Sequence, residues 1–178
     1  MSADPAFSGE RPLLPALSPH LERGESVRWT GRPSVRSILR TKSVLWWIGV
    51  PWLAFVLSAY FLGWIDRMAL VPLGMAGAAL VAAPFIMVFD SGKTVYAITN
   101  RRALIVHDGM KPRFITTPLS EMDETLEVIE TGCGAGHVYF SSGRSTKLPD
   151  TDYTGKLAFR DVANAREIAK ILDAARER

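Results

Sequence analysis

The chain has 178 residues, of which 48% are hydrophobic, and it carries a formal net charge of +3. Seven basic and four acidic residues precede residue 44, whereas residues 90–178 carry thirteen of each sign. A nucleic-acid-binding protein would concentrate its excess basic charge on the folded domain, so this distribution argues against that class. The single cysteine, Cys133, excludes an intrachain disulfide.

Two segments precede the apolar part of the chain. Residues 1–20 contain four prolines among small polar side chains and are predicted to be a flexible tail. Residues 21–43 form a basic juxtamembrane segment, in which the alternating stretch 25–29 predicts a short strand. Residues 34–42 predict an interfacial helix whose candidate head-group contacts are Arg36, Arg40 and Lys42. The alternative is that these charges only set the topology of the spans that follow.

Two apolar runs, residues 44–65 and 68–89, each contain twenty-two residues without a charge. A helix of that length reaches about 33 Å at ~1.5 Å per residue, enough for the ~30 Å hydrocarbon core of a bilayer. Neither run alternates with a period of two. We therefore predict two transmembrane helices that Asp66 and Arg67 join as a tight hairpin.

The flanking charges predict the orientation of this hairpin. Basic residues gather on the side shared by its two ends, and only Arg67 lies on the other side. The positive-inside rule therefore places both termini in the cytoplasm. Gly74, Ala78 and Ala82 recur every four residues, and this small-residue stripe predicts packing against the first span or, alternatively, a second copy of the chain. Neither run contains a charge, which argues against an ion pathway.

Residues 90–178 predict a cytoplasmic domain of short strands closed by one helix. Runs rich in β-branched and aromatic residues, separated by turn signals, predict strands over 94–99, 103–107, 113–117, 125–129, 137–141 and 157–160. Asn164 is predicted to begin an amphipathic helix, with Glu167 completing a capping box. The fold class is α+β, with the helix covering one end of an antiparallel sandwich or partly open barrel.

Several of these stretches resemble one known family. GESVRWTGRPS, then the hairpin, then TVYAITNRRALIV are similar to the bacterial pleckstrin-homology-like (PH-like) domain family, whose membrane-anchored members have unknown function. ETGCGAGHVYF and LAFRDVANAREIAKIL resemble the family's later hairpin and closing helix, so that the resemblance covers about residues 20–175. It implies a bacterial inner-membrane protein with a PH-like antiparallel β-barrel or sandwich capped by a C-terminal helix, and no known catalytic residues.

The most specific motif of that resemblance consists of Tyr96, Ile98, Thr99, Asn100 and Arg102. Asn100 tolerates the left-handed backbone that a tight turn needs, and Thr99 is expected to bond locally to the turn. Arg102 is expected either to contact lipid head groups or to form a salt bridge inside the domain. Arg101, beside it, is a fourth candidate head-group contact.

No catalytic, cofactor-binding or metal-binding residue is predicted. The glycine-rich stretch 132–136 precedes a predicted strand rather than a helix, so it indicates a hairpin turn and not a phosphate-binding loop. Cys133 lies in that turn without a recognised catalytic pattern. His20, His107 and His137 lack metal-ligand spacing, and the acidic stretch 121–130 is typical of a solvated face.

These observations predict a non-enzymatic, membrane-anchored PH-like module that mediates protein–protein or self-association at the cytoplasmic membrane surface. The expected partners are membrane lipids and a protein partner or a second copy, with no nucleic acid. One alternative is a lipid head-group binding module. The other is a non-catalytic subunit of a membrane enzyme complex.

Overall fold

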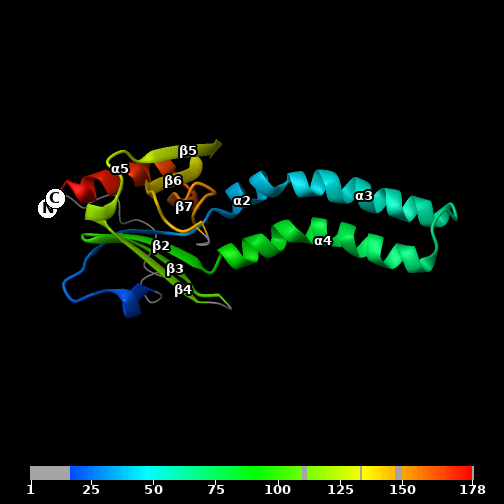
Figure 1. The fold of residues 1–178 in the computed structure, drawn as a ribbon, viewed down its shortest axis with the longest axis horizontal. Coiled ribbons are helices and arrows are strands. Elements are labelled where there is room, and N and C mark those ends of the chain that lie inside the picture. The colour runs from blue at the N-terminus through cyan, green and yellow to red at the C-terminus, as the bar shows by residue number, and fades with distance from the viewer. Residues whose placement is uncertain (1–16, 110–111, 133, 147–149, 178) are drawn as a thin grey trace. The chain divides into compact units, whose positions relative to one another are not determined.

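The computed structural model describes residues 17–109, 112–132, 134–146 and 150–177 of the chain. It has an α+β fold with two apolar helices, two antiparallel sheets and a C-terminal helix (Figure 1). The chain divides into two units. Ile38–Asp90 forms the hairpin unit, and the described residues before and after it form the α+β unit.

The hairpin unit contains α3 (Val44–Phe61) and α4 (Arg67–Ser91). The first helix ends at Phe61, four residues before the predicted end, because Gly63 adopts a left-handed conformation with φ of +74°. The amide of Gly63 donates to Tyr60 O at 3.0 Å, and that of Trp64 donates to Ala59 O at 2.9 Å. These two bonds form a Schellman motif, which satisfies carbonyls at the helix end.

The turn between the two helices is longer than the predicted pair of residues. It covers residues 62–66, and Asp66 occupies the position before α4, where its Oδ1 accepts the amide of Ala69 at 2.9 Å. An aspartate at this position satisfies one of the unpaired amides of the first helical turn. Asp66 therefore begins the second helix instead of serving as a simple linker residue.

Two glycines, Gly49 and Gly77, lie in the contact between α3 and α4. A Cβ built on Gly77 would lie 2.6 Å from Leu53 Cδ2, and one on Gly49 would lie 3.0 Å from Leu80 Cβ. By contrast, a Cβ on Gly74 would meet no atom within 4 Å, and Ala78 and Ala82 are exposed. The prediction that the stripe of Gly74, Ala78 and Ala82 packs against the first span is therefore wrong, because the stripe lies outside the contact between the two helices.

Two indole hydrogen bonds add to the contact between the helices. Trp46 Nε1 donates to Val81 O, and Trp52 Nε1 donates to Leu73 O, both at 3.0 Å. The two proline-containing helices are thus joined by polar bonds as well as by apolar contact.

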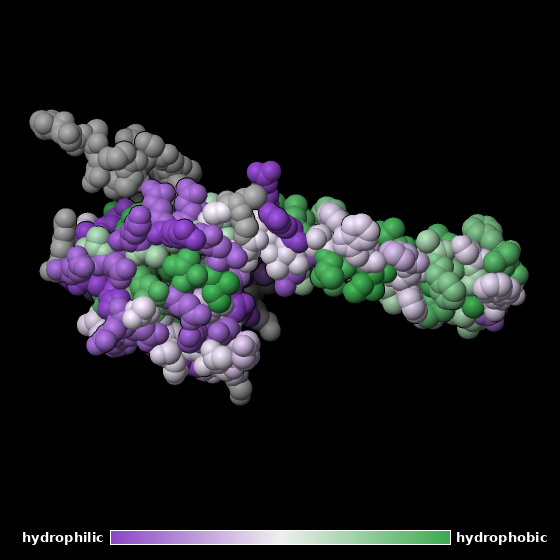
Figure 2. Space-filling view, turned by 90° about the horizontal axis from the view of Figure 1, so that it is seen from above, coloured by the Kyte–Doolittle hydropathy of each residue, from purple (hydrophilic) through white to green (hydrophobic). Residues whose placement is uncertain are grey.

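In the described part of the chain, α3 and α4 are the two helices long and apolar enough to cross a membrane. Figure 2 shows hydrophobic residues along the surface of the hairpin unit and mainly hydrophilic residues over the α+β unit. Large side chains on the hairpin helices are exposed, including Trp47, Phe61 and Met68. Length and composition therefore agree with the predicted spans.

One sheet of the α+β unit, sheet A, has the strand order β1-β2-β3-β4. Its antiparallel strands are β1 (Val27–Gly31), β2 (Thr94–Thr99), β3 (Arg102–His107) and β4 (Arg113–Pro118). Strand β1 precedes the hairpin in sequence and pairs with β2, which follows it. The folded unit therefore includes residues that were predicted to belong to the juxtamembrane segment 21–43.

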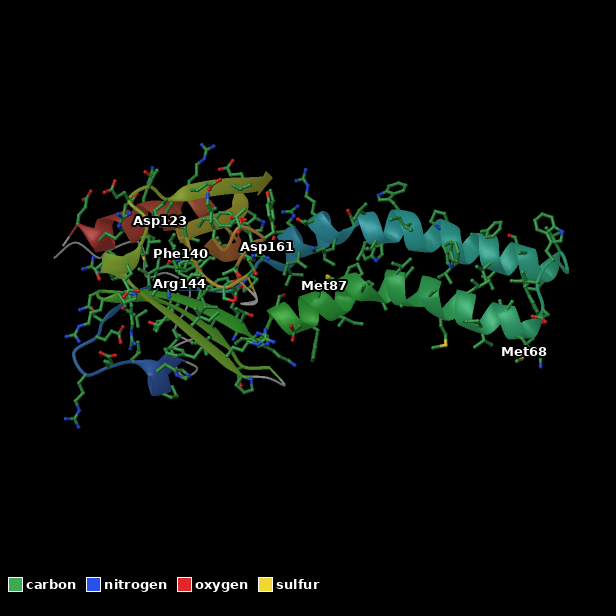
Figure 3. All side chains as sticks on the ribbon, in the orientation of Figure 1. Met68, Met87, Asp123, Phe140, Arg144 and Asp161 are labelled. Atoms are coloured by element: carbon green, nitrogen blue, oxygen red, sulfur yellow. The ribbon has the colours of Figure 1, made fainter. Side chains whose placement is uncertain are left out.

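The other sheet, sheet B, has the order β5-β6-β7. Its strands are β5 (Glu127–Gly132), β6 (Ala135–Ser141) and β7 (Leu157–Val162). Neither sheet closes on itself, so the sandwich form of the prediction agrees with the structure and a closed barrel does not. The main core contains Tyr96 and Ile105 from sheet A, Phe140 (labelled in Figure 3) and Phe159 from sheet B, and Leu172 from α5 (Ala165–Arg176).

Helix α5 begins where predicted, but without the predicted capping box. Asn164 has a left-handed backbone with φ of 55°, and its side chain makes no capping hydrogen bond. Instead, the amide of Ala165 donates to Gly134 O in the β5–β6 connection at 3.0 Å, and Asn164 O accepts the amide of Glu167 at 2.9 Å. The hairpin of sheet B thus supplies an acceptor for the first turn of the helix.

The second face of sheet A is covered by the segment that precedes β1. Leu17 and Leu21, on either side of the short 3₁₀ helix η3 (Ser18–His20), pack over Val95, Ala97, Leu104 and Val106. The ring of His20 stacks on Phe114 of β4 with centroids 4.6 Å apart. All six residues of β2 are consequently buried.

Candidate functional site

The motif residues Thr99, Asn100 and Arg102 meet at the β2–β3 turn. Thr99 is fully buried; its hydroxyl donates to Glu25 Oε1 at 2.7 Å and accepts the amides of Arg101 and Arg102 at 3.2 and 3.0 Å. The predicted local bond of Thr99 to the turn is therefore confirmed. Its long-range partner is Glu25, for which no local pattern predicted this contact.

Arg102 forms a two-point ion pair with Glu25. Its Nε lies 3.0 Å from Oε1 and its Nη2 lies 2.9 Å from Oε2, while Nη2 also donates to His20 O at 3.0 Å. The side chain of Glu25 is 0% exposed and that of Arg102 is 15% exposed. Of the two predicted roles for Arg102, the structure contains the internal salt bridge.

The environment of Glu25 favours its charged form. Burial alone would raise the pKa of this carboxyl, but hydrogen bonds from Arg102, the amide of Glu22 and Thr99 outweigh burial and lower the pKa to about 2. Glu22 pairs with Arg102 Nη1 at 3.1 Å. The cluster therefore contains ionised groups that neutralise one another.

Asn100 joins this cluster in a different way from the one predicted. Its φ is not positive, so the expected left-handed turn conformation is wrong. Its amide donates to Ser26 O, and its side-chain Oδ1 accepts the amide of Ser26, both at 3.0 Å. Asn100 thus continues the pairing of β1 and β2 by one residue beyond Thr99.

Tyr96 belongs to a second polar cluster inside the unit. Its hydroxyl donates to Asp150 Oδ1 and accepts the amide of Arg160, both at 3.3 Å, and its ring packs on Phe159. Burial is the main cause that raises the pKa of Tyr96 and that of Asp150. Asp150 and Arg160 lie in a loop and in β7, without a local pattern that would have indicated their contact with Tyr96.

A third cluster brings together a serine, an aspartate and a histidine. Ser37, on α2 (Val35–Lys42), donates to Asp161 Oδ1 at 2.7 Å, and His137 Nδ1 accepts the amide of Asp161 at 3.0 Å; Asp161 is labelled in Figure 3. A catalytic triad would place the imidazole between the hydroxyl and the carboxylate. Here the hydroxyl contacts the carboxylate directly, and Ser37 is buried.

The candidate head-group contacts fall into two groups. Arg36, Arg40 and Lys42 lie exposed on α2. Arg101 lies beyond the last residue of β2, with its side chain 55% exposed and its Nη1 3.6 Å from Glu22 Oε2. The strand register does not bring Arg101 together with the residues of α2.

The remaining sequence features have plain structural positions. Strand β5 ends at Gly132 and β6 begins at Ala135, and the two strands pair, which confirms the predicted hairpin turn. Cys133 itself lies outside the described residues. His107 Nδ1 lies 2.9 Å from Thr94 Oγ1 at the end of sheet A. Within the described residues, no three His, Cys, Asp or Glu side chains gather as metal ligands.

Comparison of the chain with protein-family models, curated proteins and solved structures finds no match. The resemblance to the PH-like family therefore stays a hypothesis.

Proposed function

We propose that the chain is a non-enzymatic, membrane-anchored PH-like module that mediates protein–protein or self-association at the cytoplasmic surface of a bacterial membrane. The observation that carries this proposal is the pairing of β1 with β2 across the hairpin. Both ends of the apolar hairpin return to one folded unit, which is the arrangement expected of an anchored domain. The motif residues support a non-enzymatic role, because their polar groups bond to one another inside the unit.

Sheet B offers the surface that supports association. Ile129 on β5 is 45% exposed, and Tyr153 in the loop before β7 is 92% exposed. That loop is held in shape, because Asp152 Oδ1 accepts the amides of Thr154 and Lys156 at 2.8 and 2.9 Å. A tyrosine on an ordered loop offers apolar area and a hydroxyl with little loss of conformational freedom on binding.

The loop and β5 belong to the same surface. Lys156 Nζ forms an ion pair with Glu127 Oε2 at 2.5 Å. Glu127 and Ile129 are two residues apart on β5, so their side chains point to the same face of the strand. We name the surface formed by Ile129, Tyr153 and the Glu127–Lys156 pair the sheet B face.

Site-specific photocrosslinking in membranes tests this function. A photoreactive residue replaces Ile129 or Tyr153 in the full-length chain, and Arg23, exposed in the segment before β1, serves as the matched control position. The proposal expects an adduct from positions 129 and 153, with the mass of a second copy or of one protein partner, and none from position 23. Absence of adducts at all three positions would contradict an association module.

The alternatives make different predictions in the same membranes. A non-catalytic subunit would crosslink to an enzyme. Lipid head-group binding is favoured by the exposed Arg36 and Arg40 on α2. The orientation is tested by a fluorescent-protein fusion at the C-terminus and a periplasmic phosphatase fused after Trp64; activity of both reporters is expected when the two termini are cytoplasmic.

A further inference from the structure

The strand register of sheet A brings a distant arginine to the point where the chain returns from the hairpin. Thr94, three residues after the end of α4, is paired with His107, which is in turn paired with Arg113. Neighbouring strands lie about 4.8 Å apart, so Arg113 lies roughly 10 Å from Thr94 across two strands. On the other side of β2, Gly31 pairs with Tyr96, and Arg32 follows toward the same end.

Four basic side chains gather at this end of the α+β unit. We call it the exit edge and define it by Arg32, Arg36, Lys93 and Arg113. Arg32, Arg36 and Arg113 are exposed and form no ion pair within the described ranges of the chain. The unit's chain leaves for the hairpin one residue after Arg36 and re-enters two residues before Lys93.

The acidic residues near the exit edge are Asp90, Asp108, Asp150 and Asp161, which equal its four basic residues in number. Asp108 is exposed beside His107. The carboxylate of Asp161 accepts a hydrogen bond from the hydroxyl of Ser37, and that of Asp150 accepts one from the hydroxyl of Tyr96. Asp150 also interacts electrostatically with Arg113. Asp150 and Asp161 are thus held by hydroxyl donors within the unit, so the exit edge is distinguished by its exposed arginines and not by its net charge.

At the other end of β2, the two arginines of the β2–β3 turn form ion pairs. Arg101 and Arg102 lie there, about 20 Å along the strand at ~3.3 Å per residue. Both are neutralised, Arg101 by Glu22 and Arg102 by Glu25. Arg28 of β1 also lies toward that end, since its neighbour Val27 pairs with Thr99. The comparison therefore concerns Arg113 on one side and the ion-paired Arg101 and Arg102 on the other.

We propose that the exit edge binds anionic lipid head groups of the bilayer that the hairpin crosses, with Arg113 as a contact residue; this inference rests on the proposed membrane anchor. The link from Ser91 to Thr94 spans at most about 11 Å. The first residues of β2 therefore stay close to the head-group layer, which is itself several ångströms thick. An arginine near an anionic surface strengthens the association about fivefold.

Hydrogen exchange of the full-length chain in nanodiscs tests this inference. One set of discs contains phosphatidylcholine alone, and the other contains phosphatidylcholine mixed with phosphatidylglycerol. We expect the peptide that covers β3 and β4 to exchange more slowly in the anionic discs and to lose this slowing at high salt. Arg113→Gln should reduce the slowing about fivefold, whereas the matched control Arg101→Gln should leave it unchanged.

Two outcomes would overturn the inference. Equal exchange in both lipid compositions would show that the exit edge does not recognise anionic head groups. Equal effects of Arg113→Gln and Arg101→Gln would show a general response to net charge. These failures differ from failure of the anchor, in which the chain would be released from membranes by alkaline carbonate and both proposals would be overturned.

Discussion

The α+β unit and the hairpin unit are stabilised by opposite means. In the α+β unit, an apolar core packs between two sheets, and an ion pair between Arg102 and Glu25 is buried at its margin. In the hairpin unit, large apolar side chains face outward, and the helices meet at two glycines and two indole hydrogen bonds. Burial of apolar surface drives the first kind of packing, whereas within lipid the second depends on close fit and polar contacts.

Among the substitutions considered, replacement of Arg102 should cause the largest loss of stability. Arg102→Ala leaves the carboxylate of Glu25 buried without its main partner, and a loss of about 3–5 kcal/mol of stability is expected for a broken buried pair. Denaturant unfolding of the α+β unit within the full-length chain measures this loss. Arg101→Ala is the matched control, with an expected loss of at most ~1 kcal/mol because its pair with Glu22 is exposed. Equal losses of stability for the two variants would contradict the view that the Arg102–Glu25 pair stabilises the unit more than the exposed Arg101–Glu22 pair does.

The same ion pair predicts a pH dependence confined to the α+β unit. The pKa of Glu25 is about 2 in the folded chain and 4.5 otherwise. Its contribution to stability is therefore fully present above pH 4.5 and is lost as the pH falls toward 2. Unfolding midpoints between pH 2 and 6 should fall more steeply for the native chain than for Glu25→Gln. Parallel curves would show that Glu25 is not the group responsible.

Glycine substitutions should separate the two faces of α4. Gly77→Leu places a large side chain where a Cβ alone would meet Leu53, and overpacking is expected to destabilise the hairpin by roughly 1–3 kcal/mol. Gly74→Leu is the matched control and should leave the distance between the helices unchanged. Distances between spin labels on α3 and α4, measured in nanodiscs, report the result. A larger change in the distance between the helices for Gly74→Leu than for Gly77→Leu would support the prediction that the stripe of Gly74, Ala78 and Ala82 packs against the first span.

The smallest expected effect concerns the indole bonds. Trp52→Phe keeps an aromatic ring but removes the donor to Leu73 O, and such bonds within membranes are worth about 0.6 kcal/mol on average. Thermal stability in detergent should fall slightly, and by a similar amount in Trp46→Phe. Trp47→Phe, at an exposed position of α3, is the control. A loss above ~2 kcal/mol in Trp52→Phe would mean that ring packing at Gly77, and not the hydrogen bond, dominates there.

Local patterns in the sequence were sufficient to predict the helices and strands, but not the side-chain and backbone contacts between them. The β-branched run 94–99 matches β2 residue for residue, since alternation and turn signals are local. The capping box at Asn164 was wrong because this residue has a left-handed backbone, and the amide of Glu167 donates to its main-chain O instead of its side chain. The small-residue stripe was assigned to the wrong face, because spacing along one helix does not show which side its neighbour occupies.

Sequence patterns were enough to predict the α+β class, two helices apolar and long enough to cross a membrane, and the positions of most strands, because hydropathy and periodicity act over short stretches of chain. Only the tertiary contacts show that β1 pairs with β2 across the hairpin, that Glu25 neutralises Arg102 seventy-seven residues away, and that Arg113 of β4 lies two strands from the start of β2. These contacts join residues far apart in sequence, and strand order and register, which no local pattern encodes, bring them together.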